Sequence, residues 1–330
     1  MSTVRPELQS AIDALHPNAR IVSLAGDAST RRFHRVYLES GGTRIVMDYG
    51  TRFEGETDDV RLARIFERAA LPVARVLDVL PEAGALLLED LGDTTLEIAL
   101  ADADAGRGRA RPELYRAAVG LAADVARRGT EALSRSERSD GPSLDEDRFR
   151  FEMQFFLDHY VVGFLKQPPT TASLGELLFE LAGRVATHPR VMCHRDYHSR
   201  NLMVLPDDTL AMVDIQDARW GPDTYDLASL LRDAYVDLEE REVAEYLDLY
   251  RTHRGHDESR SAFVSRFHAT AAQRMIKALG TFGYQVSRLG RDRYRDAIPR
   301  TLERLARLLP ADPTTRPLGS QLQALGLFSS

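Results

Sequence analysis

Lysine is almost absent from this sequence. Only Lys166 and Lys277 occur among the 43 basic residues, so arginine carries nearly all of the positive charge. A single cysteine, Cys193, excludes an intramolecular disulfide, and its place in an apolar run predicts a buried structural thiol. No run of about 18 apolar residues exists, and Met1 to Ser10 lack the apolar segment of a signal peptide, so neither a membrane span nor a secretory leader is indicated. The cytoplasm is therefore the expected compartment, with no membrane partner.

The charge balance of the chain is acidic. The net charge is −7, the pI is near 5.8, and 50 acidic residues are interspersed among the basic ones. Because no basic patch is visible, the composition argues against a nucleic-acid partner. At 330 residues with 43% hydrophobic side chains, the chain can bury a full core and is long enough for one two-lobed unit or two small domains.

A polar loop within residues 191–204, between two apolar runs, carries the most specific motif. His194 to Asp196 followed by Asn201 matches the H-R-D-L-x-x-x-N catalytic loop of protein kinases, except that Tyr197 replaces leucine. A carboxylate and an amide at this spacing suit phosphoryl transfer. Asp196 can accept the proton of an attacking hydroxyl, and Asn201 can direct its side-chain oxygen toward Mg²⁺.

A second carboxylate follows at the spacing that such a site needs. Thr209 to Val213 is a short β-prone run, so a strand is expected to deliver Asp214 beside the loop as a further Mg²⁺ ligand. This strand and the apolar run after Asn201 should form a hairpin. Downstream, Gly221-Pro222 interrupts the chain and Asp226 enters a helix.

The rest of the chain predicts an α+β fold of two lobes. Residues 1–92 predict an N-terminal nucleotide-binding lobe with a five-stranded antiparallel sheet, with strands near 21–24, 33–39, 43–47, 73–80 and 85–88 and helices near 5–15 and 57–70. Residues 93–330 predict a mainly helical catalytic and substrate lobe, with helices near 94–104, 112–133, 147–166, 173–188, 223–236, 239–253, 259–288 and 292–309. Residues 134–146 read as a surface loop and 310–330 as a tail interrupted by proline.

These motifs resemble the aminoglycoside phosphotransferase family of kinase-like small-molecule kinases, whose two-lobed fold the resemblance implies. Residues 194–201, 213–217 and 221–228 carry this resemblance. More narrowly, four stretches resemble the bacterial anomeric kinases that phosphorylate N-acetylmuramic acid and N-acetylglucosamine during cell-wall recycling. They are Asp27 to Phe33, Ile45 to Asp48, Leu87 to Gly92 and Gln273 to Lys277.

The resemblance implies ATP and Mg²⁺ as cofactors. A small-residue loop before the second strand would cover the phosphates, with contacts from Ser29, Thr30, Arg31 and Arg32. The third strand offers Met47 and Asp48 where protein kinases have a lysine, so an arginine must bind the phosphates. The candidates are Arg31, Arg32, Arg35 and Arg44. Glu89 and Leu91 belong to a segment that resembles the linker whose backbone pairs with adenine.

The acceptor site is expected on the helical lobe. The predicted contacts are Glu152, Asp158, His198, Arg200, Asp217, Gln273 and Arg274. An alternative for Asp217 is a metal or turn-capping role, and an alternative for Arg274 is an exposed charged stripe with Lys277, since residues three apart share a helix face. His194 and Asp226 are expected to support the backbone of the loop, as the corresponding residues do in kinase-like proteins.

The predicted function is ATP-dependent phosphorylation of the anomeric hydroxyl of N-acetylmuramate or N-acetylglucosamine. Its partners would be the sugar and the nucleotide. Two alternatives stay open. The chain could phosphorylate another small alcohol, such as an aminoglycoside, choline or homoserine, or it could be a catalytically silent nucleotide-binding module, which the missing strand lysine would permit.

Overall fold

The computed structural model describes residues 4–24, 31–168, 172–255 and 258–328. The chain divides into two compact units, Met1–Thr94 with Met203–Gln216 and Thr95–Leu202 with Asp217–Ser330. The sequence pattern predicts one boundary, after residue 92, and does not anticipate that residues 203–216 belong with the N-terminal part.

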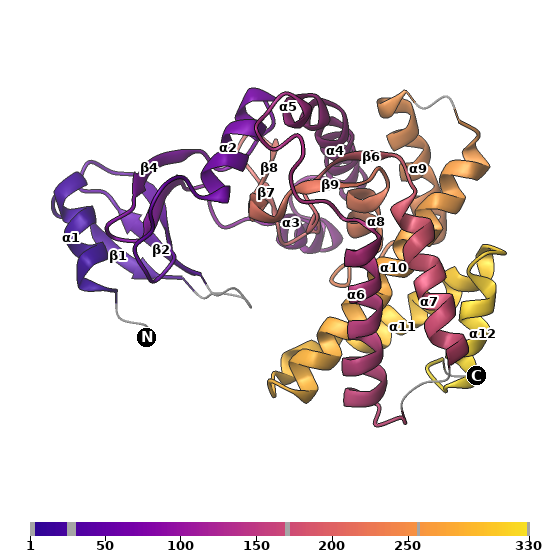
Figure 1. The fold of residues 1–330 in the computed structure, drawn as a ribbon. Helices are drawn as coiled ribbons and strands as arrows, with labels where there is room; N and C mark the ends of the chain where they lie inside the picture. Colours follow the sequence, from indigo (N-terminus) through magenta and orange to yellow (C-terminus); the bar gives the residue numbers. More distant parts are fainter. Residues whose placement is uncertain (1–3, 25–30, 169–171, 256–257, 329–330) are drawn as a thin grey trace. The chain divides into compact units, whose positions relative to one another are not determined.

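A five-stranded antiparallel sheet forms the centre of the first unit (Figure 1). The strand order is β1-β2-β3-β5-β4, and the strands are β1 (Arg20–Ser23), β2 (Arg32–Tyr37), β3 (Thr43–Asp48), β4 (Val76–Leu80) and β5 (Ala85–Glu89). Gly41 and Gly42 form the β2–β3 turn with φ of 88° and 83°, a conformation that glycine adopts without a Cβ penalty. The predicted five-stranded antiparallel sheet is confirmed.

Helices cover both faces of this sheet, because side chains alternate between the faces along each strand. Helix α1 (Pro6–Leu15) packs Leu8 and Ile12 against one face, and α2 (Asp58–Arg68) packs Val60 against the other. The first face consists of Val36, Val46, Ala85 and Leu87, and the second includes Met47 and Leu86. Met47 and Asp48, the residues at the strand position that holds lysine in protein kinases, therefore lie on opposite faces.

Asp48 is buried and held by a residue that precedes α1. The Arg5 guanidinium donates to both carboxylate oxygens of Asp48, at 2.6 Å and 3.3 Å, and to the carbonyl of Ala83. The Gly50 N–H donates to the same carboxylate at 2.8 Å, and the His34 ring lies 3.8 Å away. Burial raises the pKa of Asp48, but these partners outweigh it and lower that pKa below its ordinary value.

A short hairpin completes the first unit. Strands β7 (Leu202–Val204) and β8 (Leu210–Met212) pair with each other as predicted. The Val204 N–H donates to the Thr94 carbonyl at 2.8 Å, and the Met212 N–H donates to the Pro72 carbonyl at 2.8 Å. These bonds explain why the segment that carries Asp214 belongs with the N-terminal residues.

The second unit is mainly helical. Its helices are α3 (Leu96–Asp104), α4 (Arg111–Asp124), η1 (Val125–Gly129), α5 (Thr130–Ser134), α6 (Glu146–Phe156), η2 (Leu157–Phe164), α7 (Ala172–Ala186), α8 (Tyr225–Leu231), α9 (Glu240–Arg254), α10 (Arg260–Ser287), η4 (Asp292–Tyr294), α11 (Ala297–Ala311) and α12 (Arg316–Ala324). Helix α10 packs against α6, η2, α7, α8 and α11. Gly280 and Gly283 permit this approach, because a Cβ there would lie 2.9 Å from the Cα of Phe156 and 2.8 Å from the Cα of Tyr160.

Three local predictions for this unit need correction. The expected tail after residue 310 contains α12, which buries Leu318 and Leu322 one turn apart, and Pro317 is tolerated because it lies in the first turn of that helix. The Gly221-Pro222 break is the end of a strand, β9 (Arg219–Pro222), which pairs antiparallel with β6 (Arg190–Cys193). Helix α8 ends at Leu231 rather than near 236.

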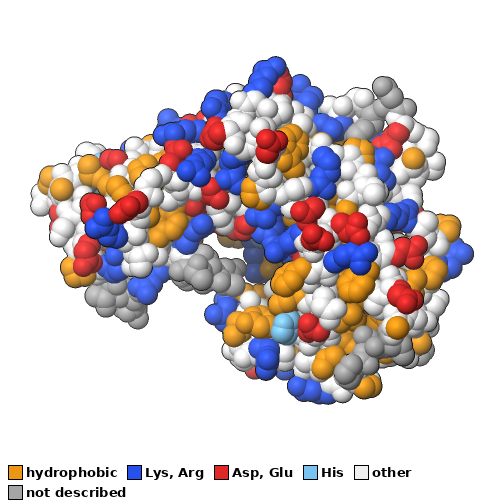
Figure 2. All heavy atoms as spheres, viewed as in Figure 1, with side chains coloured by type: hydrophobic (Ala, Val, Ile, Leu, Met, Phe, Trp, Pro, Cys, Tyr) orange, Lys and Arg blue, Asp and Glu red, His pale blue; other side chains and the backbone are white. Residues whose placement is uncertain are grey.

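One prediction from composition, the buried structural thiol, is confirmed by the structure. Cys193 is a buried free thiol. Among the residues that the structure describes, no helix combines the length and the apolar character needed to cross a bilayer. Figure 2 shows acidic and basic side chains interspersed over the visible face.

Candidate active site

The polar loop between β6 and β7 is held by a buried carboxylate. Asp226, in the first turn of α8, accepts the backbone N–H groups of His194 at 2.7 Å and Arg195 at 2.9 Å, one on each oxygen. Arg195 has φ of 81°, a left-handed conformation that a bulky residue keeps only when its surroundings enforce it. The His194 ring is buried and lies edge-on to Tyr197, with ring centroids 5.8 Å apart. Asp226 thus holds the backbone of the loop as predicted, while a supporting role of the His194 side chain stays a prediction.

Three further elements fix the same loop. The Tyr197 hydroxyl donates to the Ala118 carbonyl of α4 at 2.8 Å, and Asp233 accepts the Ser199 N–H at 2.8 Å. From α10, Arg274 donates to the Arg195 carbonyl at 2.9 Å, with its guanidinium 4.3 Å from the centroid of a neighbouring tyrosine ring. The loop is therefore preorganised by contacts on several sides.

Asp196 lies on this loop with 28% of its side chain exposed. Its Oδ1 is 3.9 Å from Nζ of Lys277 on α10. Burial alone would raise the pKa of Asp196, but the positive charges of Lys277, Arg195 and Arg274 outweigh it and hold that pKa well below its ordinary range. The carboxylate is therefore ionised at neutral pH and able to accept a hydrogen bond from a hydroxyl.

The side chain of Asn201 is held by a hydrogen bond within the loop. Its amide nitrogen donates to the Asp196 carbonyl at 2.9 Å, so the amide oxygen is the atom that can face a metal ion. Asn201 directly precedes β7, and Asp214 follows β8 two residues after its end. Amide and carboxylate oxygens are the hard donors that Mg²⁺ prefers, together with nucleotide phosphates and water.

Asp214 lies in the first unit and its side chain is exposed. It has φ of 63°, and the Gln216 side-chain amide donates to its Oδ1 at 2.7 Å. Within the described residues, no group of three or more His, Cys, Asp and Glu side chains is arranged to hold a metal. The Asp214 carboxylate is a hard oxygen donor of the kind that Mg²⁺ prefers, and its binding of the metal stays a prediction.

The arginines predicted to bind phosphate have distinct environments, while Ser29 and Thr30 lie outside the described residues. The Arg31 guanidinium donates to Asp59 of α2 at 3.1 Å. Arg35 makes two bonds to Asp90, at 2.7 Å and 3.1 Å, so it ties β2 to the segment after β5. Arg32 is exposed at the start of β2, and Arg44 donates to the carbonyl of the preceding residue at 2.8 Å.

Asp59 was not anticipated from the sequence. It is 7% exposed and also accepts the Tyr49 hydroxyl at 2.7 Å. Burial raises the pKa of Asp59, and the nearby negative charge of Asp214 acts in the same direction. An acidic residue in the first turn of a helix ordinarily indicates only a favourable interaction with the helix dipole, so the sequence carried no signal for its pairing with Arg31.

The segment predicted to contact adenine follows β5. Glu89 ends that strand, and its side chain pairs with Arg75 at 3.0 Å. This hydrogen bond lowers the pKa of Glu89, which burial alone would raise. Leu91 is half-buried. A main-chain contact of this segment with adenine stays a prediction.

A cavity of about 150 Å³ within the second unit adjoins Asp196. Its polar lining consists of Asp196, His198, Ser229, Arg232, Asp233, Tyr235, Arg274, Lys277, Thr281 and Thr301. Two predicted acceptor contacts, His198 and Arg274, are among them. Lys277 was not among the predicted contacts, although it belongs to the Gln-Arg-x-x-Lys stretch.

The other predicted acceptor contacts lie outside this lining. Gln273 is fully buried and donates to the buried Glu152 at 2.8 Å. Asp158 is exposed and accepts the Gln154 side-chain amide at 2.8 Å. Arg200 pairs with Glu97 at 2.8 Å, and Asp217 pairs with Arg195 at 2.9 Å and Arg219 at 2.6 Å. Sugar contacts from these residues stay predictions.

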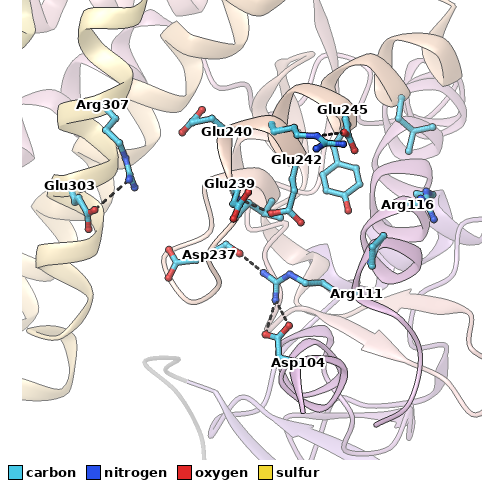
Figure 3. Close-up of a pocket in the computed structure, with 15 residues that line it drawn as sticks. Asp104, Arg111, Arg116, Asp237, Glu239, Glu240, Glu242, Glu245, Glu303 and Arg307 are labelled. Atoms are coloured by element: carbon cyan, nitrogen blue, oxygen red, sulfur yellow. Dashed lines mark hydrogen bonds and ion pairs between the residues drawn. The ribbon is translucent and has the colours of Figure 1, made fainter. Parts of the chain in front are cut away.

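A larger groove of about 1060 Å³ shares no lining residue with this cavity. Its acidic side chains are partly neutralised by arginine, as Figure 3 shows for Arg111, which pairs with Asp104 at 2.8 Å, and for Arg307, which pairs with Glu303 at 3.4 Å. None of the predicted site residues lines it. The smaller cavity beside Asp196 is therefore the candidate acceptor site.

The kinase-like loop and the fold are those of a phosphotransferase, and residues 20–263 match the model of the phosphotransferase enzyme family, APH. The chain belongs to this family, and it is an ATP-dependent kinase. It is 31% identical to the N-acetylmuramate/N-acetylglucosamine kinase of Pseudomonas aeruginosa over 94% of this chain and 89% of that protein. It is 30% identical to the kinase of the same name from Caulobacter vibrioides, over 86% of each chain.

Solved structures share the fold at low sequence identity. An ethanolamine kinase from Plasmodium vivax has a TM-score of 0.61 at 12% identity, covering 93% of this chain and 88% of that one. An amicoumacin kinase in complex with AMP-PNP and Ca²⁺ has a TM-score of 0.60 at 14% identity, covering 95% and 93%. These neighbours confirm the kinase-like two-lobed fold class.

Proposed function

We propose that this kinase transfers the γ-phosphoryl group of ATP to the anomeric hydroxyl of an N-acetylated amino sugar, N-acetylmuramate or N-acetylglucosamine, giving the sugar 1-phosphate. The observation that carries the proposal is an ionised Asp196 beside a polar cavity, in a chain about 30% identical to kinases named for these two sugars over most of its length. The cytoplasm, where ATP is made, is the proposed compartment.

In this reaction the anomeric oxygen forms a bond to the γ-phosphorus, and the bond from that phosphorus to the bridging oxygen breaks to release ADP. Asp196 accepts the proton of the hydroxyl. An anomeric hydroxyl is more acidic than other sugar hydroxyls, so a carboxylate of low pKa accepts its proton more readily. Asn201 and Asp214 would hold Mg²⁺ together with the ATP phosphates. When bound, the ion would neutralise negative charge that develops during phosphoryl transfer.

The size of the cavity limits what it can enclose. At about 150 Å³ it is smaller than most ligand pockets, which run from roughly 300 to 1,000 Å³. It therefore accommodates the reacting end of a sugar rather than the whole molecule. The hydroxyl, carboxylate and cationic groups that line it suit a polyhydroxylated ring.

The test compares N-acetylglucosamine with its methyl glycoside, in which the anomeric oxygen is blocked. Only the free sugar should release ADP and yield a non-reducing phosphate, whereas a 6-phosphate keeps its reducing end. Asp196→Asn, expected to lower turnover by about 10²–10⁴-fold, is the control for enzyme-dependent transfer. Equal phosphorylation of both sugars would refute the anomeric assignment and favour a broader alcohol kinase, to be identified with aminoglycosides, choline and homoserine as acceptors.

A further inference from the structure

Helix α10 brings a single ammonium group to the candidate catalytic carboxylate. Lys277 lies three residues after Arg274, so both side chains share one face of the helix, and both line the cavity with Asp196. Nζ of Lys277 is 3.9 Å from Oδ1 of Asp196, which is too long for a hydrogen bond. The two groups therefore attract each other without direct hydrogen bonding.

That separation admits one oxygen atom between them. An oxygen can lie about 2.7 Å from a carboxylate oxygen and about 2.9 Å from an ammonium nitrogen at the same time when those two atoms are this far apart. A hydroxyl in this position would donate its proton to Asp196 and accept a hydrogen bond from Lys277. This is the position of an attacking oxygen in the proposed reaction.

The neighbouring arginines are already engaged. Arg195 pairs with Asp217 at 2.9 Å, and Arg274 donates to the Arg195 carbonyl at 2.9 Å and to the Ser229 hydroxyl at 2.6 Å. Among the residues that the structure describes, none makes a hydrogen bond to Nζ of Lys277. With 22% of its side chain exposed, the ammonium has N–H donors to offer to a molecule in the cavity.

Burial and the surrounding charges together hold the pKa of Lys277 below its ordinary value. Burial lowers the pKa of Lys277, while the negative charges of Asp196 and Glu152 oppose that shift and the positive charges of Arg274 and Arg195 add to it. The nearest carboxylate is the one at 3.9 Å. A protonated lysine is a compact charge with rotatable donors, which suits a single oxygen better than the planar guanidinium of arginine does.

We propose that Lys277 is a catalytic residue that donates a hydrogen bond to the attacking acceptor oxygen. As the proton passes to Asp196 and the oxygen binds the phosphorus, the ammonium stabilises the negative charge on that oxygen and stays protonated itself. The role rests on the proposed phosphoryl transfer to a hydroxyl, but not on which sugar carries that hydroxyl. In this proposal, one of the two lysines of the chain donates a hydrogen bond to the attacking oxygen, while arginines stabilise the loop.

The test is steady-state kinetics of full-length Lys277→Met, with Lys166→Met as the matched control. Lys166 is the other lysine of the chain, is exposed, and lies outside the cavity lining. Lys277→Met should lower kcat by about 10²–10³-fold, the effect of losing one preorganised donor, and should leave the ATP KM unchanged. Lys166→Met should match the wild type in both parameters.

Chemical rescue separates this role from a structural one. Lys277→Ala opens space in the cavity, so added ethylammonium should restore part of kcat in that variant and none in Asp196→Asn. Thermal unfolding of every variant reports folding independently. A kcat of Lys277→Met within about tenfold of the wild type, or loss of kcat without rescue in a folded Lys277→Ala, overturns the proposal. Failure of the sugar assignment can be told apart from failure of the Lys277 proposal. In the first case the wild type phosphorylates a different alcohol, and the same variants are then measured with that alcohol as acceptor.

Discussion

Replacing Arg5 with methionine tests whether Asp48 is a structural group rather than part of the nucleotide site. The guanidinium donates to both oxygens of Asp48, whose side chain is 1% exposed, while that of Arg5 is 21% exposed. Removing one partner of a buried ion pair costs about 3–5 kcal/mol, since the other charge is left buried without compensation. Because water reaches Arg5, we expect the lower end, about 3 kcal/mol of unfolding free energy.

The loss of unfolding free energy caused by Arg5→Met should depend on pH in a defined direction. The folded-state pKa of Asp48 is below its ordinary value, so the pair stabilises the protein fully above the unfolded pKa of about 3.9 and loses this contribution as pH falls through the folded pKa. In Arg5→Met, burial acts on Asp48 without its main partner and raises that pKa. The difference in stability between wild type and variant should therefore be larger at pH 7 than at pH 4.

Urea denaturation at both pH values measures these differences. Arg5→Met/Asp48→Asn should recover at least half of the loss at pH 7, because no charge is then left buried, and its ATP KM should stay that of the wild type. Arg52→Met is the control. Arg52 forms exposed ion pairs with Glu54 and Glu82, so its replacement should cost at most about 1 kcal/mol of unfolding free energy. An equal cost at both pH values, or a double variant no more stable than Arg5→Met, would refute the reasoning.

Two further predictions concern the nucleotide. Asp214→Ala removes a hard oxygen ligand, so activity should collapse even at high Mg²⁺, and superimposable Mg²⁺ titrations of variant and wild type would contradict the assignment. Arg31→Ala should raise the ATP KM or lower kcat, because Arg31 is oriented by Asp59, whereas Arg35→Ala should lower the melting temperature by breaking its bonds to Asp90. If Arg31→Ala has wild-type kinetics, another cation binds the phosphates.

The sequence predicts those features of the fold and the site that depend on a short local pattern of residues. β-prone runs predicted the five strands, and the resemblance to kinase-like proteins predicted that Asp226 holds the backbone of the loop. Helix α12 was missed because proline was read as a breaker rather than as a first-turn residue. The partners of Arg31 and Arg274 could not be predicted, since Asp59 and the Arg195 carbonyl reach them only through tertiary packing.

The way in which the catalytic loop is anchored indicates how the acceptor specificity of this enzyme can be changed. Asp226, Tyr197 and Arg274 hold the loop backbone, whereas the wall of the cavity also includes Thr281 and Phe282 of α10 and Thr301 of α11. The two sets do not overlap, and none of the three wall residues bonds to the loop. On the proposed function, substitutions at these three residues are expected to change acceptor preference with little effect on the loop. Libraries that randomise these three wall residues can be searched for retargeted kinases while the loop and its reacting carboxylate keep their geometry.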